Sequence, residues 1–574
     1  MIKKIIQRNT IIPSKDFHHF PLELQQIYAN RGIVALDELE LELKALLSFH
    51  DLLGIAEAVN LLFEMLEQDK RILILGDFDA DGATSSALAV SALKAFGVNE
   101  VSYLVPNRFE YGYGLTPEIV AVALQWRPDL IVTVDNGISS CAGVLEAKKH
   151  GVKVLITDHH LPGREIPEAD AIVNPNQAND KFGSKNLAGV GVIFYVMLAL
   201  RSFLRQKNWF LEKKISEPNM AEFLDLVALG TVADVVPLDK NNRILVHHGL
   251  QRIRAGLSRP GIKALIAIAN RTEKRLSAAD LGYAVGPRLN AAGRLDDMSL
   301  GIECLLASEL AKSEEMARLL DELNQERRFI EQEMQQQALV ELNKLRLENK
   351  ENLPIGLCLF DENWHQGVIG ILAGRIKDRW QRPTIAFAPA NEKEIKGSAR
   401  SVAGLHIRDV LDTVASQYPG LITKFGGHAM AAGLSLLREN YHAFARAFDQ
   451  EVRRHLNEKD LQHIIYSDGN LHEDNFTIEF AELIQSAGPW GQAFPEPIFD
   501  DHFRVLEQRL VGNKHLKLTL KRQEKLIDAI AFNIDVERWP NHRCQTIHMA
   551  YRLDINEYRG LRSVQLLIEH LEEA

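Results

Sequence analysis

The sequence predicts an α/β protein: a parallel-sheet domain joined by a long helix to a smaller α/β domain, followed by a C-terminal all-β barrel. Between about residues 50 and 310, short apolar segments such as Arg71–Gly76 alternate with amphipathic helical patterns, which indicates a parallel sheet covered on both faces. Residues 308–348 contain neither proline nor glycine, which favours one long helix. Period-two alternation around Leu516–Leu520 and Ile547–Ile555 predicts an antiparallel sheet or small barrel.

These patterns divide the chain into five expected parts. An N-terminal extension over residues 1–48 precedes the parallel-sheet domain at residues 49–307. The connecting helix takes residues 308–350, the smaller α/β domain 351–455 and the barrel 456–574. A length of 574 residues is also too great for one ordinary core, which favours several domains.

The composition is typical of a globular protein of a reducing compartment. No stretch approaches the roughly 20 apolar residues of a membrane helix, and the N-terminus lacks the apolar segment of a secretory signal. The net charge of −11 argues against a nucleic-acid coat protein but is compatible with a nuclease whose carboxylates bind cations. A cytoplasmic location is expected, because the four cysteines are far apart in the sequence: Cys141, Cys304, Cys358 and Cys544.

The strongest local signal is an acidic run at the end of an apolar strand. Asp77, Asp79 and Asp81 lie within Gly76-Asp-Phe-Asp-Ala-Asp-Gly82. Two like charges about 4 Å apart repel by about 4 kcal/mol at an effective dielectric near 20, so a divalent cation is the expected counter-charge. The alternatives are a helix cap or a calcium loop, but the twelfth position of such a loop is Leu88 rather than glutamate.

Further acids and histidines follow later segments. Asp135 ends the next strand, the triplet Asp158-His159-His160 ends the one after, and Asp234 interrupts an apolar run. One such acid is often only a helix cap, but the full set is difficult to explain in that way. Carboxylates with imidazole suit Mn²⁺, with Mg²⁺ as the alternative. The number of groups favours two ions, and therefore hydrolysis of a phosphate ester or anhydride.

The order of these motifs resembles the DHH phosphoesterase superfamily, and within it most closely the RecJ exonucleases. The resemblance rests on GDFDADG, DNG, DHH and VADVVPL, and it extends over roughly residues 50–570. Other RecJ-like motifs are Pro106–Gly114, Gly286–Arg294, Gly397–Ser401 and Phe425–His428.

The resemblance implies a role for each matching residue. The implied metal ligands are Asp77, Asp79, Asp81, Asp135, His159 and Asp234, with His160 as the catalytic residue beside the scissile phosphate. The implied nucleic-acid contacts are Arg108, Tyr113, Arg288, Asn290, Arg294, Arg400, Ser401, Gly426, Gly427, His428 and, in an oligonucleotide-binding barrel, Lys517. Tight turns, close helix packing and a lysine-guarded sheet edge are the simpler interpretations of these residues.

The resemblance further implies 5′→3′ removal of mononucleotides from single-stranded DNA by two divalent cations, in recombination and repair. The expected partners are single-stranded DNA, a helicase and a single-strand-binding protein, and the expected state is a monomer without membrane contact. The alternatives are a DHH hydrolase of short oligonucleotides or other small phosphates, which the barrel disfavours, and a non-catalytic DNA-binding scaffold. The complete Asp and His set argues against the scaffold.

Overall fold

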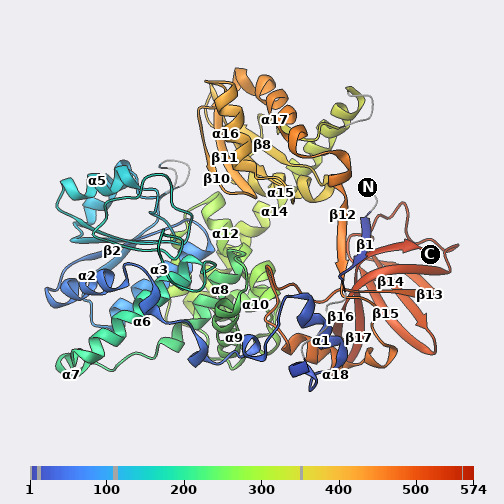
Figure 1. Cartoon of the computed structure of the whole chain (residues 1–574), viewed down its shortest axis with the longest axis horizontal. Helices are drawn as coiled ribbons and strands as arrows, with labels where there is room; N and C mark the ends of the chain where they lie inside the picture. Colours follow the sequence, from blue (N-terminus) through green and yellow to red (C-terminus); the bar gives the residue numbers. More distant parts are fainter. Residues whose placement is uncertain (1–2, 10–14, 108–110, 112–113, 349–352, 559) are drawn as a thin grey trace. The chain divides into compact units, whose positions relative to one another are not determined.

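A computed structural model of the chain describes residues 3–9, 15–107, 111, 114–348, 353–558 and 560–574 (Figure 1). The chain folds into two compact units. The larger unit comprises Gln7–Asn324 and Ser467–Ala574, and the smaller comprises Met1–Ile6 and Gln325–Tyr466.

The larger unit contains a five-stranded sheet in which all neighbours are parallel. The strand order is β3 (Val101–Leu104), β2 (Ile72–Gly76), β4 (Leu130–Val134), β5 (Lys153–Thr157) and β6 (Ala171–Val173). Strands β2 and β4 are buried along their whole length, as their continuous apolar sequences predict.

Helices cover both faces of this sheet, as predicted. Leu73 and Leu75 of β2 face one hydrophobic cluster, which includes residues of α4 (Pro117–Ala123) and α5 (Cys141–Lys149). Ile72 and Ile74 face another cluster, which includes residues of three helices: α2 (Ile55–Glu67), α3 (Ala80–Ala95) and α6 (Gly189–Gln206).

One helix of the described residues, α6, is long and apolar enough to cross a membrane. Leu43–Asp51 and Ile55–Glu67 pass the same test only as a pair bent by 87°. In this fold 67% of α6 is buried, and the helix packs against α2 and α3 in the hydrophobic core. Helix α6 is therefore a core helix of the parallel-sheet domain.

The alternation of strands and helices ends at Val173, earlier than the sequence patterns indicate. The segment that follows is helical because a buried helix produces the same continuous apolar sequence as a buried strand. Its helices include α7 (Trp209–Lys213), α8 (Leu224–Ala233), α9 (Lys240–Arg254), α10 (Pro260–Ile268), α11 (Ala278–Asp280), the π-helix Leu281–Val285, α12 (Gly286–Leu295) and α13 (Ser299–Leu306).

The predicted long helix is α14 (Leu310–Glu348), which contains 39 residues. The boundary between the two units falls within it, at Asn324 and Gln325. The prediction of a helix that joins two domains is therefore confirmed.

The smaller unit contains a mixed sheet with the order β10-β11-β9-β8-β7. Only β7 and β8 are parallel, and the other neighbours are antiparallel. The elements are β7 (Leu357–Phe360), α15 (Ile369–Trp380), β8 (Thr384–Pro389), β9 (Glu394–Arg400), α16 (Ile407–Gln417), β10 (Lys424–Gly427), β11 (Ala431–Leu437) and α17 (Tyr441–His455). A further pair joins β1 (Lys3–Gln7) to β12 (His463–Ser467).

The C-terminal segment forms the predicted barrel. Its closed strand order is β13 (Phe499–Val511), β14 (His515–Arg522), β15 (Lys525–Ala531), β17 (Leu561–Glu573) and β16 (Thr546–Tyr558), and α18 (Ile478–Ser486) precedes it. The alternating leucines of β14, Leu516, Leu518 and Leu520, are fully buried, which confirms the period-two prediction.

The N-terminal extension packs on the segment that leads into the barrel. Helix α1 (Leu22–Asn30) precedes Arg31, whose guanidinium lies 2.6 Å from the carboxylate of Asp468. The hydroxyl of Tyr28 donates to the carbonyl oxygen of Ala487 at 3.1 Å. The two ends of the larger unit therefore support one another.

Candidate metal centre

The acidic run, Asp77–Gly82, forms an acidic loop that follows β2 and includes the first turn of α3. Asp77 and Asp81 are buried, with 6% and 1% of their surface exposed. Asp79 is the N-cap of α3, and its Oδ1 accepts hydrogen bonds from the N–H groups of Asp81 and Gly82, both at 3.0 Å. The local sequence therefore places three carboxylates at the carboxyl end of the strand, where ligands of open α/β sheets bind.

Later segments bring acids and imidazole to the same edge. The Nε2 of His159 lies 3.1 Å from an oxygen of Asp135 and 3.5 Å from an oxygen of Asp234, which follows α8 directly. Asp135 has a φ of +63°, and Val235, the residue after Asp234, has a φ of +62°. Positive φ is unfavourable for such residues, most of all for a β-branched one, and it often marks a functional site.

The predicted metal residues and His160 form three overlapping groups. Within each group, one ligand atom per residue lies within 4.8 Å of the others. The groups are Asp77 with Asp79 and Asp135, Asp81 with His159 and Asp234, and Asp135 with His159 and His160. These donors are carboxylate oxygens and imidazole nitrogens, so they fit Mn²⁺ or Mg²⁺. Asp135 and His159 each belong to two of the groups, so two neighbouring ions could share them as ligands.

The electrostatics of the centre favour a bound cation. Burial, followed by the negative charge of Asp79, raises the pKa of Asp81 to about 7. Burial and the charge of Asp81 raise the pKa values of Asp135 and Asp234 well above the ordinary range. Ionisation of all these acids within one buried site is therefore unfavourable without a counter-charge.

The N-terminus of α6 binds the carboxylate of Asp81. The carboxylate of Asp81 accepts hydrogen bonds from the N–H groups of Gly189 at 2.6 Å and Val190 at 2.9 Å. A helix N-terminus stabilises negative charge in this way. A Cβ on Gly189 would lie 2.5 Å from the Cβ of Asp135, so this close approach of the helix requires glycine.

The first residue of the DHH triplet orients the third. Asp158 is buried, and its Oδ1 lies 2.7 Å from the Nδ1 of His160. Burial opposes ionisation of Asp158, but the hydrogen bond and charge of His160 outweigh it and lower the pKa of this acid. Burial likewise opposes protonation of His160, but Asp158 and neighbouring carboxylates raise its pKa to about 9. Asp158 was not among the predicted site residues, although its place before two histidines is a usable signal.

Comparisons with known proteins identify three domains in the chain. Residues 71–231 match the DHH family, N-terminal domain, residues 353–454 match the DHHA1 domain, and residues 467–570 match the RecJ OB domain. The single-stranded-DNA-specific exonuclease RecJ of Dickeya dadantii is 55% identical over 553 residues, which cover 96% of each chain. The chain belongs to the RecJ family.

Other RecJ proteins are also similar to the chain. RecJ of Escherichia coli is 53% identical over 96% of each chain. The crystal structure of RecJ in complex with Mn²⁺ from Thermus thermophilus matches with a TM-score of 0.79 and 28% identity, over 96% of this chain and 76% of that chain. The corresponding complex with Mg²⁺ matches with a TM-score of 0.73 and 26% identity, over 100% and 78%. The three matched domains correspond to the predicted parallel-sheet domain, smaller α/β domain and barrel.

On α12, the predicted DNA contacts Arg288 and Asn290 are engaged within the protein. Arg288 is buried, and its guanidinium lies 2.8 Å from the carboxylate of Asp321 in α14, which favours a structural role. Asn290 accepts a hydrogen bond from the N–H of Ala80 in the acidic loop at 2.8 Å. Arg294, on the same helix, is partly exposed. The predicted contacts Arg108 and Tyr113 lie outside the described residues.

The predicted phosphate-binding residues of the RecJ DHHA1 domain lie close together. Arg400 ends β9 opposite Ala431, and the N–H of His428 donates to the carbonyl oxygen of Ala431 at 2.8 Å. Gly427 in the adjoining turn has a φ of +143°. The buried Ser401 donates its hydroxyl to the carbonyl oxygen of Leu405 at 2.8 Å. Gly426 continues the same strand, so the motif forms one end of the sheet.

The basic residues of the barrel are mostly engaged within the protein. Lys517 lies 2.9 Å from the carboxylate of Asp528, and Lys521 lies 3.2 Å from that of Glu524. Two further basic residues, Arg522 and Lys525, donate to the carbonyl oxygens of Leu471 and Glu473. Intramolecular pairing reduces the attraction that these four side chains offer to phosphate.

The outer face of the barrel also carries residues that were not predicted from the sequence. Arg509 is exposed and lies opposite Lys517 in the β13–β14 register, and Arg504 lies opposite Lys521. Phe532 is 58% exposed and contacts the ring of His515 edge-on at 5.1 Å. Cations beside an exposed aromatic ring are typical of surfaces that bind single strands.

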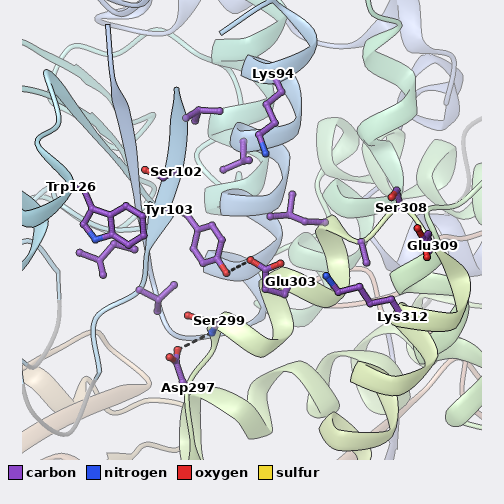
Figure 2. Close-up of a pocket in the computed structure, with 16 residues that line it drawn as sticks. Lys94, Ser102, Tyr103, Trp126, Asp297, Ser299, Glu303, Ser308, Glu309 and Lys312 are labelled. Atoms are coloured by element: carbon purple, nitrogen blue, oxygen red, sulfur yellow. Dashed lines mark hydrogen bonds between the residues drawn. The ribbon is translucent and has the colours of Figure 1, made fainter. Parts of the chain in front are cut away.

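A cavity of about 680 Å³ lies beside the edge strand β3 (Figure 2). Tyr103 donates to Glu303 across it at 2.6 Å, and Lys94 and Lys312 also line it. Among the described residues that line this cavity, none is a predicted metal or nucleic-acid residue. The cavity is therefore distinct from the candidate centre.

Proposed function

We propose that the chain is a metal-dependent exonuclease that degrades single-stranded DNA from its 5′ end and releases mononucleotides. The observation that carries the proposal is the convergence of Asp and His from four chain segments into groups with ligand atoms within 4.8 Å. It is supported by 55% identity to a relative named single-stranded-DNA-specific exonuclease RecJ. The family resemblance implies the 5′→3′ polarity and the mononucleotide product, and a degradation assay with blocked strand ends tests both.

Two divalent cations would be held by this centre, Mn²⁺ or Mg²⁺. The residues that would hold them are Asp77, Asp79, Asp81, Asp135, His159 and Asp234. Such cations, when bound, polarise a phosphate and lower the pKa of water. The RecJ structures from Thermus thermophilus contain the same two kinds of ion, which supports this assignment.

The chain's own side chains orient the reacting groups. Asp158 binds the Nδ1 of His160 and fixes the plane of the imidazole beside the metal ligands. In this position a protonated His160 donates a hydrogen bond to a phosphate oxygen and stabilises the charge that develops there. Asp79 and Asp81 are held by backbone N–H groups, which fix their direction without neutralising their charge.

Several of the predicted nucleic-acid contacts belong to the DNA path. In α12, Arg294 contacts the strand. In the DHHA1 domain, the strand's phosphates are bound by Arg400, Ser401, Gly426, Gly427 and His428. Their proximity at one end of the β9–β11 sheet supports this assignment. Lys517, with the neighbouring exposed Arg509, contacts the strand on the barrel.

The biological setting follows from the substrate. An enzyme of single strands in recombination and repair depends on a helicase that separates duplex DNA and on contact with a single-strand-binding protein. We place this activity in the cytoplasm and assign it to a monomer. Co-purification from cells with and without nuclease treatment tests whether the partners bind protein or only DNA.

One degradation assay tests the activity and its polarity. The substrates are single-stranded DNA, the same strand blocked at its 5′ end, the same strand blocked at its 3′ end and blunt duplex, each with Mn²⁺, Mg²⁺ or EDTA. The proposal requires metal-dependent loss of the unblocked and 3′-blocked strands only. Degradation of the 5′-blocked strand instead of the 3′-blocked strand would indicate 3′→5′ polarity. If no strand is degraded, dinucleotides are tested next. Their hydrolysis would favour a small-substrate DHH enzyme, and inertness toward them too would favour a scaffold.

A further inference from the structure

Helix α12 contacts the acidic loop directly at two points. The Oδ1 of Asn290 accepts a hydrogen bond from the N–H of Ala80 at 2.8 Å. One turn later, Gly293 lies so close to the loop that a Cβ there would be 1.7 Å from the carbonyl oxygen of Phe78. Residues three apart share one face of a helix, so one face of α12 rests on the loop that carries the metal ligands.

Asn290 completes the hydrogen bonding of this loop. Asp77 accepts from the N–H of Phe78 at 2.7 Å, and Asp79 accepts from the two N–H groups after Ala80, each at 3.0 Å. The N–H of Ala80 stands at the first position of α3, where a helix offers no acceptor of its own. Asn290 supplies that acceptor from a position 210 residues later in the sequence.

We propose that Asn290 is a positioning residue of the metal centre. Its amide oxygen fixes the backbone between Asp79 and Asp81 and thereby sets the separation of their carboxylates. The inference rests on the proposed metal-dependent function. It also separates Asn290 from the DNA contacts that the resemblance implies for its motif.

The two roles make opposite predictions. If Asn290 positions the loop, its loss leaves a loop N–H without an acceptor and lets the carboxylates move, while the affinity for DNA is unchanged. Residues that support metal ligands typically change metal affinity about 10–100-fold when they are replaced. If Asn290 instead contacts DNA, its loss weakens DNA binding and leaves metal affinity unchanged.

The experiment compares four full-length proteins: wild type, Asn290→Ala, Asn290→Asp and Asn99→Ala. Calorimetry measures Mn²⁺ affinity without substrate, and fluorescence anisotropy measures the affinity for a labelled single strand in EDTA. Asn290→Ala is expected to bind Mn²⁺ about 10–100-fold more weakly and DNA as wild type does. Asn290→Asp, which keeps an acceptor oxygen, should recover most of the Mn²⁺ affinity. Asn99 bonds Asp69 at an exposed site, so its variant should match wild type.

Three results would overturn the proposal. One is weaker DNA binding by Asn290→Ala with unchanged Mn²⁺ affinity, and another is no change in either affinity. The third is loss of both affinities together with a lower unfolding temperature, because the damage would then be general. A wild-type protein that binds Mn²⁺ but degrades no single strand would refute the proposed function instead, and the Mn²⁺ comparison would still decide the role of Asn290.

Discussion

Removal of the metal ions is expected to make the protein less stable as the pH rises through 7, because Asp81 must then ionise inside the fold. Burial and the charge of Asp79 raise the pKa of Asp81 from 3.8 to about 7, so folding favours the protonated acid. This stability is fully present below the unfolded-state pKa and is lost as the pH rises through the folded-state pKa. At 1.36 kcal/mol per pKa unit the whole effect is about 4 kcal/mol, of which about 2 kcal/mol falls between pH 8 and pH 5.5.

Urea unfolding of the wild type and of Asp81→Asn in EDTA, at pH 5.5, 7 and 8, measures this effect. Relative to the variant, the wild type should gain about 2 kcal/mol of unfolding free energy between pH 8 and pH 5.5. The difference between the two proteins is needed because His160, whose pKa is raised to about 9, and Asp135 and Asp234, whose pKa values are raised by burial, add stability in the same direction in both. Saturating Mn²⁺ should reverse the trend in the wild type, since ligand carboxylates bind metal only when deprotonated. A difference that stays flat with pH in EDTA would refute the reasoning.

The other predictions concern the centre, its packing and the barrel. His159→Ala should abolish hydrolysis of single-stranded DNA in Mn²⁺ while circular dichroism stays unchanged; retained hydrolysis would contradict its role as a ligand. Gly293→Ala should destabilise the protein by about 1–3 kcal/mol in urea unfolding. Gly374→Ala, a helical control with no atom within 4 Å of the added Cβ, should instead be neutral or stabilising by about 0.5–1 kcal/mol. Equal effects of the two would contradict the close packing of α12. Arg509→Ala should lower the salt dependence of DNA affinity by about 0.7 in logarithmic slope, and an unchanged slope would exclude a phosphate contact.

The metal centre could be predicted from the sequence because parallel strands end at one edge of their sheet. Asp77, Asp135 and His159 follow three strands that are neighbours in the sheet, and the register of β2, β4 and β5 brings these strand ends together. The barrel was predictable for a related reason, because its buried leucines alternate with exposed residues. In the first case a local pattern determines at which edge of the sheet a side chain lies, and in the second it determines which face of the sheet the side chain occupies.

Other roles depend on packing between distant segments, which no local pattern records. The sequence cannot show that Arg288 pairs with a carboxylate of α14 instead of facing solvent. Nor can it show that Lys517 lies against Asp528 on the neighbouring strand. A basic or amide side chain in a motif is equally consistent with binding a ligand and with supporting the fold. For Asn290 only the hydrogen bond to the acidic loop distinguishes the two.

The support of the acidic loop also explains why glycine occurs where helices meet the centre. A lysine or arginine beside Asp79 or Asp81 would hold the carboxylate but would compete with a cation for its charge. Backbone N–H groups bond the carboxylate and leave its charge available. They can do so only if a helix backbone comes very close, as α6 does at Gly189. Helix α12 also comes very close at Gly293, against the carbonyl oxygen of Phe78. The same arrangement leaves a buried cluster of acids with raised pKa values. Replacement of one of these acids should therefore stabilise the metal-free protein and weaken its affinity for metal.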